Sequence, residues 1–192
     1  MTTLQADRLL ECEGLACPPP VVRTKKTMDE MDAGEVLEVR ATDQGSVADL
    51  RSWSGRAGHE YIGVKEENGV FRHFIRKAEA TDTKAERNYP HIASNEEVYE
   101  EIASGKEIRI LDVREPAEYA FGHIPGAVSI PLGQLEARMS ELDPGQAYYL
   151  VCRTGVRSDL ACRILSDQGF QHIKNVIPGM SEWTYAQEHG EH

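Results

Sequence analysis

The residues best suited to chemistry in this chain are a cysteine and two arginines close behind it. They belong to the run Cys152, Arg153, Thr154, Gly155, Val156, Arg157 and Ser158. An apolar stretch typical of a strand precedes the run and a helical pattern follows it. Backbone N–H groups and the helix dipole stabilise an anion at such a junction, and the arginines add positive charge. The run therefore predicts anionic sulfur chemistry, with Cys152 held as a thiolate or persulfide.

Several residues near this run are expected to support it. Ser158 fits the N-cap of the following helix. Asp112 and Arg114 end a neighbouring predicted strand at the same edge of the sheet, so we expect an ion pair beneath the loop rather than direct contact with a substrate. We expect His123 to be structural as well. Cys162 lies within the helical run and is expected to be a small core residue rather than a resolving thiol.

A second cysteine, Cys17, stands directly before three prolines. Prolines such as Pro18 and Pro20 fit the first turn of a helix because the N–H groups there lack partners anyway. The thiol is therefore expected to be exposed, stiffly held and near the positive end of the helix dipole, with no pocket around it. Such a thiol suits the transfer of a group to another protein. We expect Cys12 to be a core strand cysteine, with a Cys12–Cys17 disulfide as the alternative.

The elements that must position Cys17 read as a small two-layer α/β sandwich of order βαβαββ. The predicted elements are a strand beginning at Leu9-Leu10, a helix over 18–31, a strand over 37–41, a helix over 47–53, and strands over 61–66 and 70–76. Alternation of Leu37, Val39 and Ala41 with polar residues predicts one buried strand face. Asn68-Gly69 between the last two strands is a strong hairpin signal, because both residues tolerate a positive φ.

The elements around Cys152 predict a doubly wound parallel α/β sheet. A capping box at Ser94 and Glu97 opens the region. Strands are expected over 108–113, 127–130, 147–151 and 173–176, separated by helices over 132–142 and 158–168. This alternation is typical of a mostly parallel sheet with helices on both faces. We therefore expect a first domain over 1–77, a polar linker over 78–90 and a second domain over 91–192.

Composition limits the classes of partner and cofactor. The net charge is −11, and the region 91–192 alone holds 8 basic against 16 acidic residues. Such a chain is a poor candidate for binding DNA or RNA. No basic and apolar leader opens the sequence, and no apolar run is long enough to span a bilayer, so we expect a cytoplasmic protein with reduced thiols. The four cysteines do not follow zinc-site spacing, and we expect no metal or organic cofactor.

Three more stretches join the cysteine run in a pattern that resembles the rhodanese family. They are Leu111–Tyr119, Gly122–Ala127 and Pro178–Trp183, and with the run they cover roughly residues 91–187 in order. The resemblance implies that Cys152 attacks the outer sulfur of thiosulfate or another sulfane donor and becomes a persulfide. It also implies that Arg153 and Arg157 orient the anionic donor while the N–H groups of residues 153–157 stabilise the persulfide.

Loop length separates this chemistry from a related one. Cysteine phosphatases and arsenate reductases of related architecture place their arginine six residues after the cysteine. Here Arg157 is the fifth residue after Cys152, and Ser158 is the sixth. The shorter loop makes a tighter cup that suits one outer sulfur better than a phosphate. Phosphatase or arsenate reductase activity is the weaker alternative.

The stretch around Cys17 resembles the TusA/SirA sulfur-carrier family. It matches in Gly14-Leu15, in Cys17-Pro18-Pro19-Pro20, in Thr24-Lys25-Lys26, in Asp43-Gln44-Gly45-Ser46 and in Gly58-His59-Glu60. The resemblance covers about residues 8–77 and implies that Cys17 carries a persulfide. Its fusion to a rhodanese-like region joins two consecutive steps of sulfane-sulfur transfer in one chain.

The sequence thus predicts a sulfurtransferase that moves sulfane sulfur from thiosulfate or a low-molecular-weight persulfide through Cys152 and Cys17. The sequence leaves open the direction in which sulfur passes between the two cysteines. The alternative is a carrier and docking module with a weakly active second domain. Its partners would be other sulfur-trafficking proteins, such as a cysteine desulfurase, a DsrE-like protein or a thiosulfate transporter.

Overall fold

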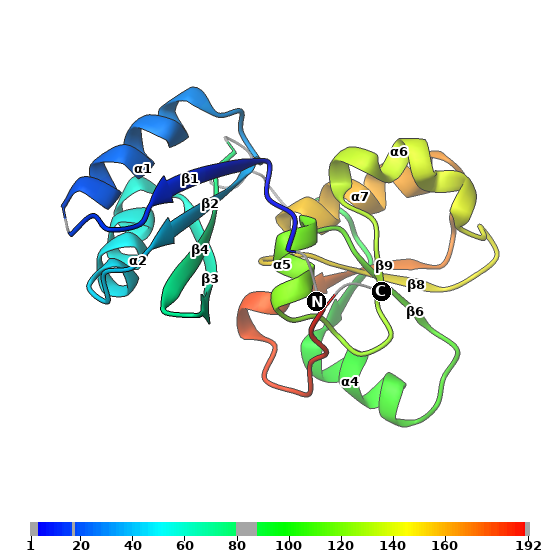
Figure 1. The fold of residues 1–192 in the computed structure, drawn as a ribbon. Coiled ribbons are helices and arrows are strands. Elements are labelled where there is room, and N and C mark those ends of the chain that lie inside the picture. Colours follow the sequence, from blue (N-terminus) through cyan, green and yellow to red (C-terminus); the bar gives the residue numbers. More distant parts are fainter. Residues whose placement is uncertain (1–3, 17, 80–87, 191–192) are drawn as a thin grey trace. The chain divides into compact units, whose positions relative to one another are not determined.

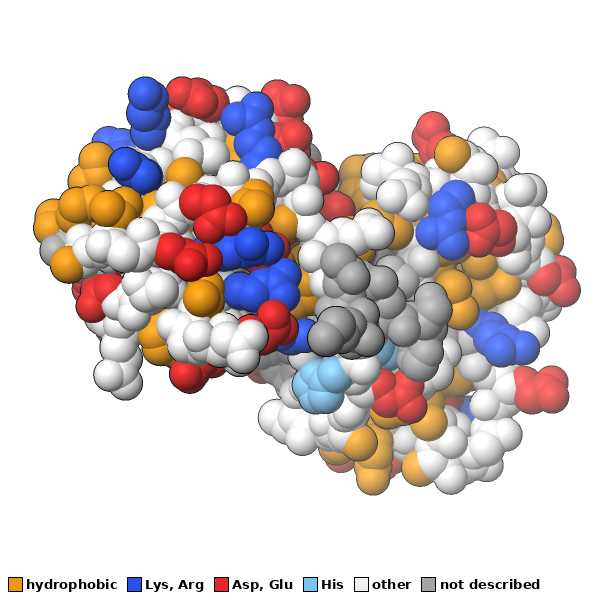
Figure 2. Space-filling view, viewed as in Figure 1, with side chains coloured by type: hydrophobic (Ala, Val, Ile, Leu, Met, Phe, Trp, Pro, Cys, Tyr) orange, Lys and Arg blue, Asp and Glu red, His pale blue; other side chains and the backbone are white. Residues whose placement is uncertain are grey.

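A computed structural model describes residues 4–16, 18–79 and 88–190 of the chain. These residues form two compact units, one before the segment 80–87 and one after it (Figure 1). Most of the predicted linker over 78–90 lies outside the described residues. On the face seen in Figure 2, the Lys and Arg side chains are interspersed with Asp and Glu side chains.

The first unit is a four-stranded sheet with two helices, in the predicted order βαβαββ. Its elements are β1 (Arg8–Cys12), α1 (Pro19–Glu30), β2 (Val36–Ala41), α2 (Ser46–Ala57), β3 (Glu60–Glu67) and β4 (Val70–Arg76). The strand order is β1-β2-β4-β3, with β1 parallel to β2 and the other pairs antiparallel. The βαβαββ sandwich predicted for this region is confirmed.

Local sequence signals explain much of this unit. Asn68 and Gly69 both have positive φ, at 54° and 79°, and they join β3 to β4 as predicted. Leu37 and Val39 are fully buried under the helices. The other face of β2 differs from the expectation, since Glu38 is only 5% exposed. Burial opposes its ionisation, but hydrogen bonds from Arg72 and Arg40 lower the pKa of Glu38 below its ordinary value.

A buried histidine links three elements of the first unit. The Nε2 atom of His73 on β4 lies 2.9 Å from the hydroxyl of Ser46, and its Nδ1 atom lies 2.8 Å from the hydroxyl of Tyr61. His73 is fully buried. Burial lowers the pKa of His73 from 6.5 to about 4, so the ring is neutral near pH 7.

This histidine should make the first unit sensitive to acid. Between pH 6.5 and about 4 the unfolded chain binds a proton that folded His73 excludes, so stability falls as the pH falls through this window. The loss is expected to reach up to about 3 kcal/mol. Hydrogen exchange of peptides from β2 and β4 at pH 7 and at pH 4.5 measures this loss of stability. The observed rates are divided by the intrinsic exchange rate at each pH before they are compared. The variant His73→Gln should lose most of the pH dependence; an unchanged dependence would contradict the assignment.

The second unit is a five-stranded parallel sheet with helices on both faces. Its strands are β5 (Ile92–Ser94), β6 (Arg109–Asp112), β7 (Val128–Ser129), β8 (Tyr148–Val151) and β9 (Ile173–Ile177). Its α-helices are α4 (Asn95–Ala103), α5 (Pro116–Phe121), α6 (Leu135–Arg138) and α7 (Val156–Asp167). The strand order is β5-β9-β8-β6-β7, and every pair is parallel. In Figure 1, α6 and α7 lie on the opposite side of the sheet from α4.

The doubly wound parallel sheet is confirmed, with local differences. The serine of the predicted capping box caps α4, since the N–H of Glu97 donates to the Ser94 hydroxyl at 3.0 Å. Strand β5 was not predicted, because three residues are too few for a periodic signal. The helix expected over 132–142 is broken into a 3-10 turn (Leu132–Gln134), the short α6 and a second 3-10 turn (Met139–Glu141).

Candidate active site

Cys152 follows directly on β8, and α7 begins at Val156. The loop between them lies at the carboxyl edge of the parallel sheet, where ligands of such sheets bind. Arg153 is exposed and Thr154 is half-buried, whereas Cys152 is only 1% exposed. Val156 is half-buried as the first residue of the helix. The cysteine is therefore enclosed by the loop rather than displayed on the surface.

One backbone N–H and one hydroxyl oxygen face the sulfur of Cys152. The N–H of Gly155 donates to Sγ at 3.1 Å, and the hydroxyl of Ser158 lies 3.3 Å from it. Gly155 has φ 86°, a left-handed conformation that costs glycine little. A Cβ here would also lie 3.0 Å from Cγ1 of Ile177. The Gly155 N–H, at the amino end of α7, stabilises negative charge on the sulfur.

The segment after β9 fixes how the loop peptides point. The N–H of Met180 donates to the carbonyl of Cys152 at 2.9 Å, and the N–H of Ser181 donates to the carbonyl of Arg153 at 2.8 Å. In a planar trans peptide the N–H points opposite to the carbonyl. The N–H groups of Arg153 and Thr154 therefore point away from this segment, and the loop is preorganised with donors on its inner side.

Ser158 lies in the first turn of α7 and not at its N-cap, so the capping role predicted for it is wrong. The N-cap residue of α7 is Gly155, which has no side chain that could cap the helix. The Ser158 hydroxyl instead lies between Cys152 and Asn175, whose Oδ1 is 2.7 Å away. The Nδ2 of Asn175 donates to the Gly155 carbonyl at 2.9 Å. Asn175 is fully buried on β9, and only its polarity within an apolar strand could have marked it in the sequence.

Arg157 is turned toward a carboxylate that the sequence did not connect with it. Its Nη1 and Nη2 atoms each donate at 2.7 Å to the carboxylate of Glu118 on α5. Arg157 is 5% exposed and Glu118 is 2% exposed. Arg157 was expected to add positive charge at the loop, and in the structure a buried bidentate ion pair with Glu118 balances that charge. Its predicted contact with the donor stays a prediction.

Asp112 and Arg114 form the ion pair expected from their spacing. Nη2 of Arg114 lies 2.6 Å from Oδ2 of Asp112 and also donates to the carbonyl of Gly122 at 2.8 Å. Although burial opposes it, the adjacent Asp112 carboxylate raises the pKa of the Arg114 guanidinium. His123 is fully buried, with Nδ1 2.9 Å from the carbonyl of Tyr119. These contacts tie the end of β6 to α5.

Of the three remaining cysteines, the structure describes Cys12 and Cys162 but not Cys17. Cys162 on α7 is fully buried in the core cluster that also contains Leu135 of α6, and burial raises the pKa of its thiol well above the ordinary value. Cys12 is a free thiol in the core of the first unit, and burial raises its pKa as well. Cys17 lies outside the described residues. Next to it, Pro18 is exposed at the cap of α1 and Pro20 is buried in its first turn.

Two family models match the chain, one in each half. The model for sulfurtransferase TusA matches residues 8–77, and the model for the rhodanese-like domain matches residues 94–186. A Bacillus subtilis (strain 168) protein called "Putative sulfur carrier protein YrkF" is 45% identical over 181 residues. The match covers 94% of this chain and 97% of that protein. The chain belongs to this family of fused TusA and rhodanese-like domains.

Each half also has relatives of its own. The sulfur carrier protein TusA of Allochromatium vinosum is 44% identical to the TusA half over 72 residues, which are 38% of this chain and 95% of that protein. The crystal structure of a rhodanese-like domain protein from Staphylococcus aureus has a TM-score of 0.50 and 29% identity, covering 53% of this chain and 99% of that one. Membership of this TusA–rhodanese family indicates a sulfurtransferase kind of reaction.

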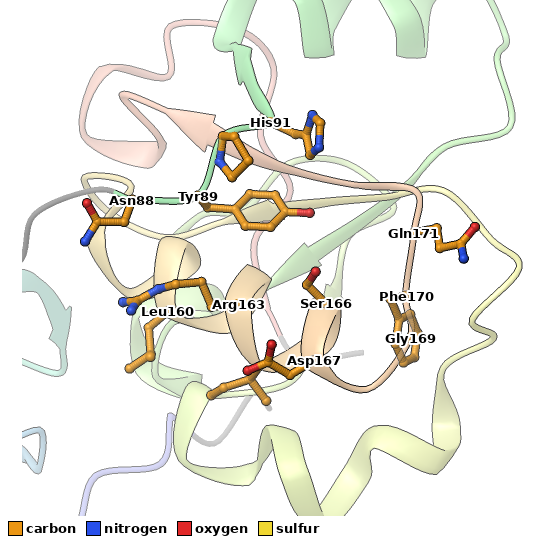
Figure 3. Close-up of a pocket in the computed structure, with 12 residues that line it drawn as sticks. Asn88, Tyr89, His91, Leu160, Arg163, Ser166, Asp167, Gly169, Phe170 and Gln171 are labelled. Atoms are coloured by element: carbon orange, nitrogen blue, oxygen red, sulfur yellow. The ribbon is translucent and has the colours of Figure 1, made fainter.

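Three further observations concern the described residues of the TusA–rhodanese chain outside the Cys152 loop. A cavity of about 660 Å³ lies in the rhodanese-like domain between residues 88–91 and α7 (Figure 3). No residue of the Cys152 loop lines it. Among the described residues, no group of three or more His, Cys, Asp or Glu side chains could hold a metal ion. None of the described helices combines the length and the apolar character needed to cross a membrane.

Proposed function

We propose that this protein moves sulfane sulfur from thiosulfate or a small persulfide through persulfides on Cys152 and Cys17. The observation that carries the proposal is the position of the Cys152 sulfur, which faces the Gly155 N–H and the Ser158 hydroxyl at the amino end of α7. This setting stabilises an anionic sulfur both before and after it accepts a second sulfur atom.

The first step is a displacement at sulfur. The Cys152 thiolate attacks the outer sulfur of thiosulfate, a new S–S bond forms, and sulfite leaves with the electron pair of the broken S–S bond. Cys152 then carries an anionic persulfide, on which the inner donors of the loop act. Arg153, exposed on the loop, is the arginine that we propose orients the incoming anion.

The second step passes the sulfur between the domains. The Cys17 thiolate attacks the outer sulfur of the Cys152 persulfide, forming a Cys17 persulfide and returning the Cys152 thiolate. We propose that a linker over 78–90 joins domains over 1–77 and 91–192. A flexible linker of this length reaches roughly 20 Å and gives an effective concentration on the order of mM. Transfer within one chain is then faster than transfer between dilute molecules.

A second function is favoured by the pairing of Arg157 with Glu118, which leaves the loop less positive than its sequence indicates. In this version the protein relays persulfide between partner proteins, and its rhodanese-like domain turns over small donors slowly. The partners would be other sulfur-trafficking proteins, such as a cysteine desulfurase or a DsrE-like protein. Fast turnover of small donors, together with a pull-down that recovers no sulfur-handling protein, would count against this version.

Replacing Cys152 tests the first function directly. Cys152→Ala is expected to abolish thiocyanate formation from thiosulfate and cyanide in the full chain, because no other thiol of the loop can take its place. The matched control is Cys162→Ala, which removes a buried thiol from the same domain and should retain most of the activity. Activity retained by Cys152→Ala would refute the assignment of this cysteine.

A further inference from the structure

Four charged side chains interact and are buried near the amino end of α7, the helix that follows the Cys152 loop. Arg157 pairs with Glu118 through two hydrogen bonds of 2.7 Å, and Arg114 pairs with Asp112 at 2.6 Å. All four side chains are 8% exposed or less. The cluster holds two positive and two negative charges, so its net charge is zero.

The cluster lies where it can influence the chemistry at sulfur. Arg157 is the second residue of α7 and stands two positions after Gly155, whose N–H contacts the Cys152 sulfur. Glu118 comes from α5, which follows β6, the strand next to β8 in the sheet. Glu118 is further held in place by its Oε2, which accepts from the N–H of Glu115 at 3.0 Å. The carboxylate is therefore a fixed neighbour of the loop.

The charge balance matters because sulfane donors differ in charge. Thiosulfate brings two negative charges to the sulfur, whereas the persulfide of an uncharged thiol brings one at most. An uncompensated arginine behind the loop would favour the dianion, since buried charges interact strongly over short distances. A paired arginine loses most of that preference.

Resting on the proposed function, we propose that Glu118 is a specificity-determining residue, which acts through Arg157 to favour small persulfides over thiosulfate. In the favoured reaction, the Cys152 thiolate attacks the outer sulfur of R–S–SH. The persulfide Cys152–S–SH forms, the donor S–S bond breaks, and the thiolate RS⁻ leaves with the bonding electron pair. The step is balanced and needs no further oxidant or reductant.

The test compares two donors in the full chain. The rate of sulfur loading is measured as kcat/KM with cyanide as the acceptor, for thiosulfate and for the persulfide of 2-mercaptoethanol. Glu118→Gln is expected to raise the ratio of thiosulfate to persulfide efficiency by about tenfold, because it changes the net charge of the four-residue cluster from zero to positive. A merely structural role would lower both efficiencies together and leave the ratio unchanged, which would overturn the proposal.

Three controls separate charge from structure. Glu101→Gln removes a paired carboxylate that contacts Tyr149 and Lys106 instead of the loop, and it should leave the ratio unchanged. Glu118→Asp keeps the charge and should do the same. The double variant Glu118→Gln with Arg157→Gln is neutral again and should return the ratio toward that of the wild type. A tenfold rise that persists in the double variant would overturn the proposal.

The wild type provides a test that no folding defect can obscure. It should load sulfur from the persulfide with a higher kcat/KM than from thiosulfate, and the reverse order would overturn the proposal. If neither donor loads Cys152 at all, the proposed function fails instead. Loading that depends on Cys152, with a ratio insensitive to Glu118, leaves the proposed function standing and removes only the role of Glu118.

Discussion

Alanine in place of Gly179 is expected to slow the loading of sulfur onto Cys152 by about 100-fold. A Cβ at this position would lie 2.5 Å from the carbonyl oxygen of Cys152 and 3.1 Å from that of Arg153. Both are backbone atoms, so the loop itself must move. The φ of 84° adds strain for any residue that carries a Cβ.

The surroundings of Gly179 leave it little freedom to retreat. Nδ2 of Asn95 donates to the Gly179 carbonyl at 2.9 Å, and the Gly179 N–H donates back to Oδ1 of Asn95 at 3.3 Å. The strain is therefore expected to displace the loop and to misalign the N–H groups inside it. Time-resolved mass spectrometry of the Cys152 persulfide measures the loading rate.

Gly169→Ala is the matched control. Gly169 has a similar φ of 94°, but a Cβ there meets nothing within 4 Å. This variant carries the backbone strain without the clash and should load sulfur at close to the wild-type rate. Equal loading by the two alanine variants would contradict the role given to the segment after β9.

Asp112→Asn is expected to destabilise the rhodanese-like domain by about 3 to 5 kcal/mol. The substitution keeps the shape but removes the charge that balances Arg114, which is 6% exposed beside a fully buried Asp112. Four hydrogen bonds from Arg114, one of them from its backbone N–H, reach the Asp112 carboxylate. An uncompensated buried charge costs more than the hydrogen bonds alone would suggest.

Urea unfolding in a Trp53→Phe background, followed by the fluorescence of Trp183, measures this loss, because Trp183 is buried in the same domain. The control is Glu141→Gln, which breaks the exposed pair of Glu141 with Arg138. Surface pairs contribute little, so this variant should unfold near the wild-type midpoint. Similar midpoints for the two variants would show that the buried pair does not support the domain as described.

Features that depend on neighbouring residues were predictable from the sequence. The Asn68-Gly69 turn and the Ser94 cap are set within four residues, and both appear where the pattern places them. The ion pair of Asp112 and Arg114 follows from their positions two residues apart at the end of one strand. Local chemistry decides such features, so no knowledge of tertiary contacts is needed.

Features of the site that depend on distant segments were not predictable in this way. Glu118 reaches Arg157 and Asn175 reaches Ser158 only because α5, α7 and β9 meet at one edge of the sheet. The observed start of α7 at Val156 differs from the predicted start at residue 158 for a similar reason. Gly155 closes the loop in a left-handed conformation, so the helix begins before Ser158 and the hydroxyl faces the sulfur instead of capping the helix.

The most direct test of the sulfur relay is peptide mass spectrometry after brief thiosulfate treatment of the wild type, Cys17→Ala and Cys152→Ala. We predict an added sulfur on both cysteines of the wild type, on Cys152 in Cys17→Ala, and on neither cysteine in Cys152→Ala. Sulfur that appears on Cys17 in the absence of Cys152, or on neither cysteine of the wild type, would contradict a relay from Cys152 to Cys17.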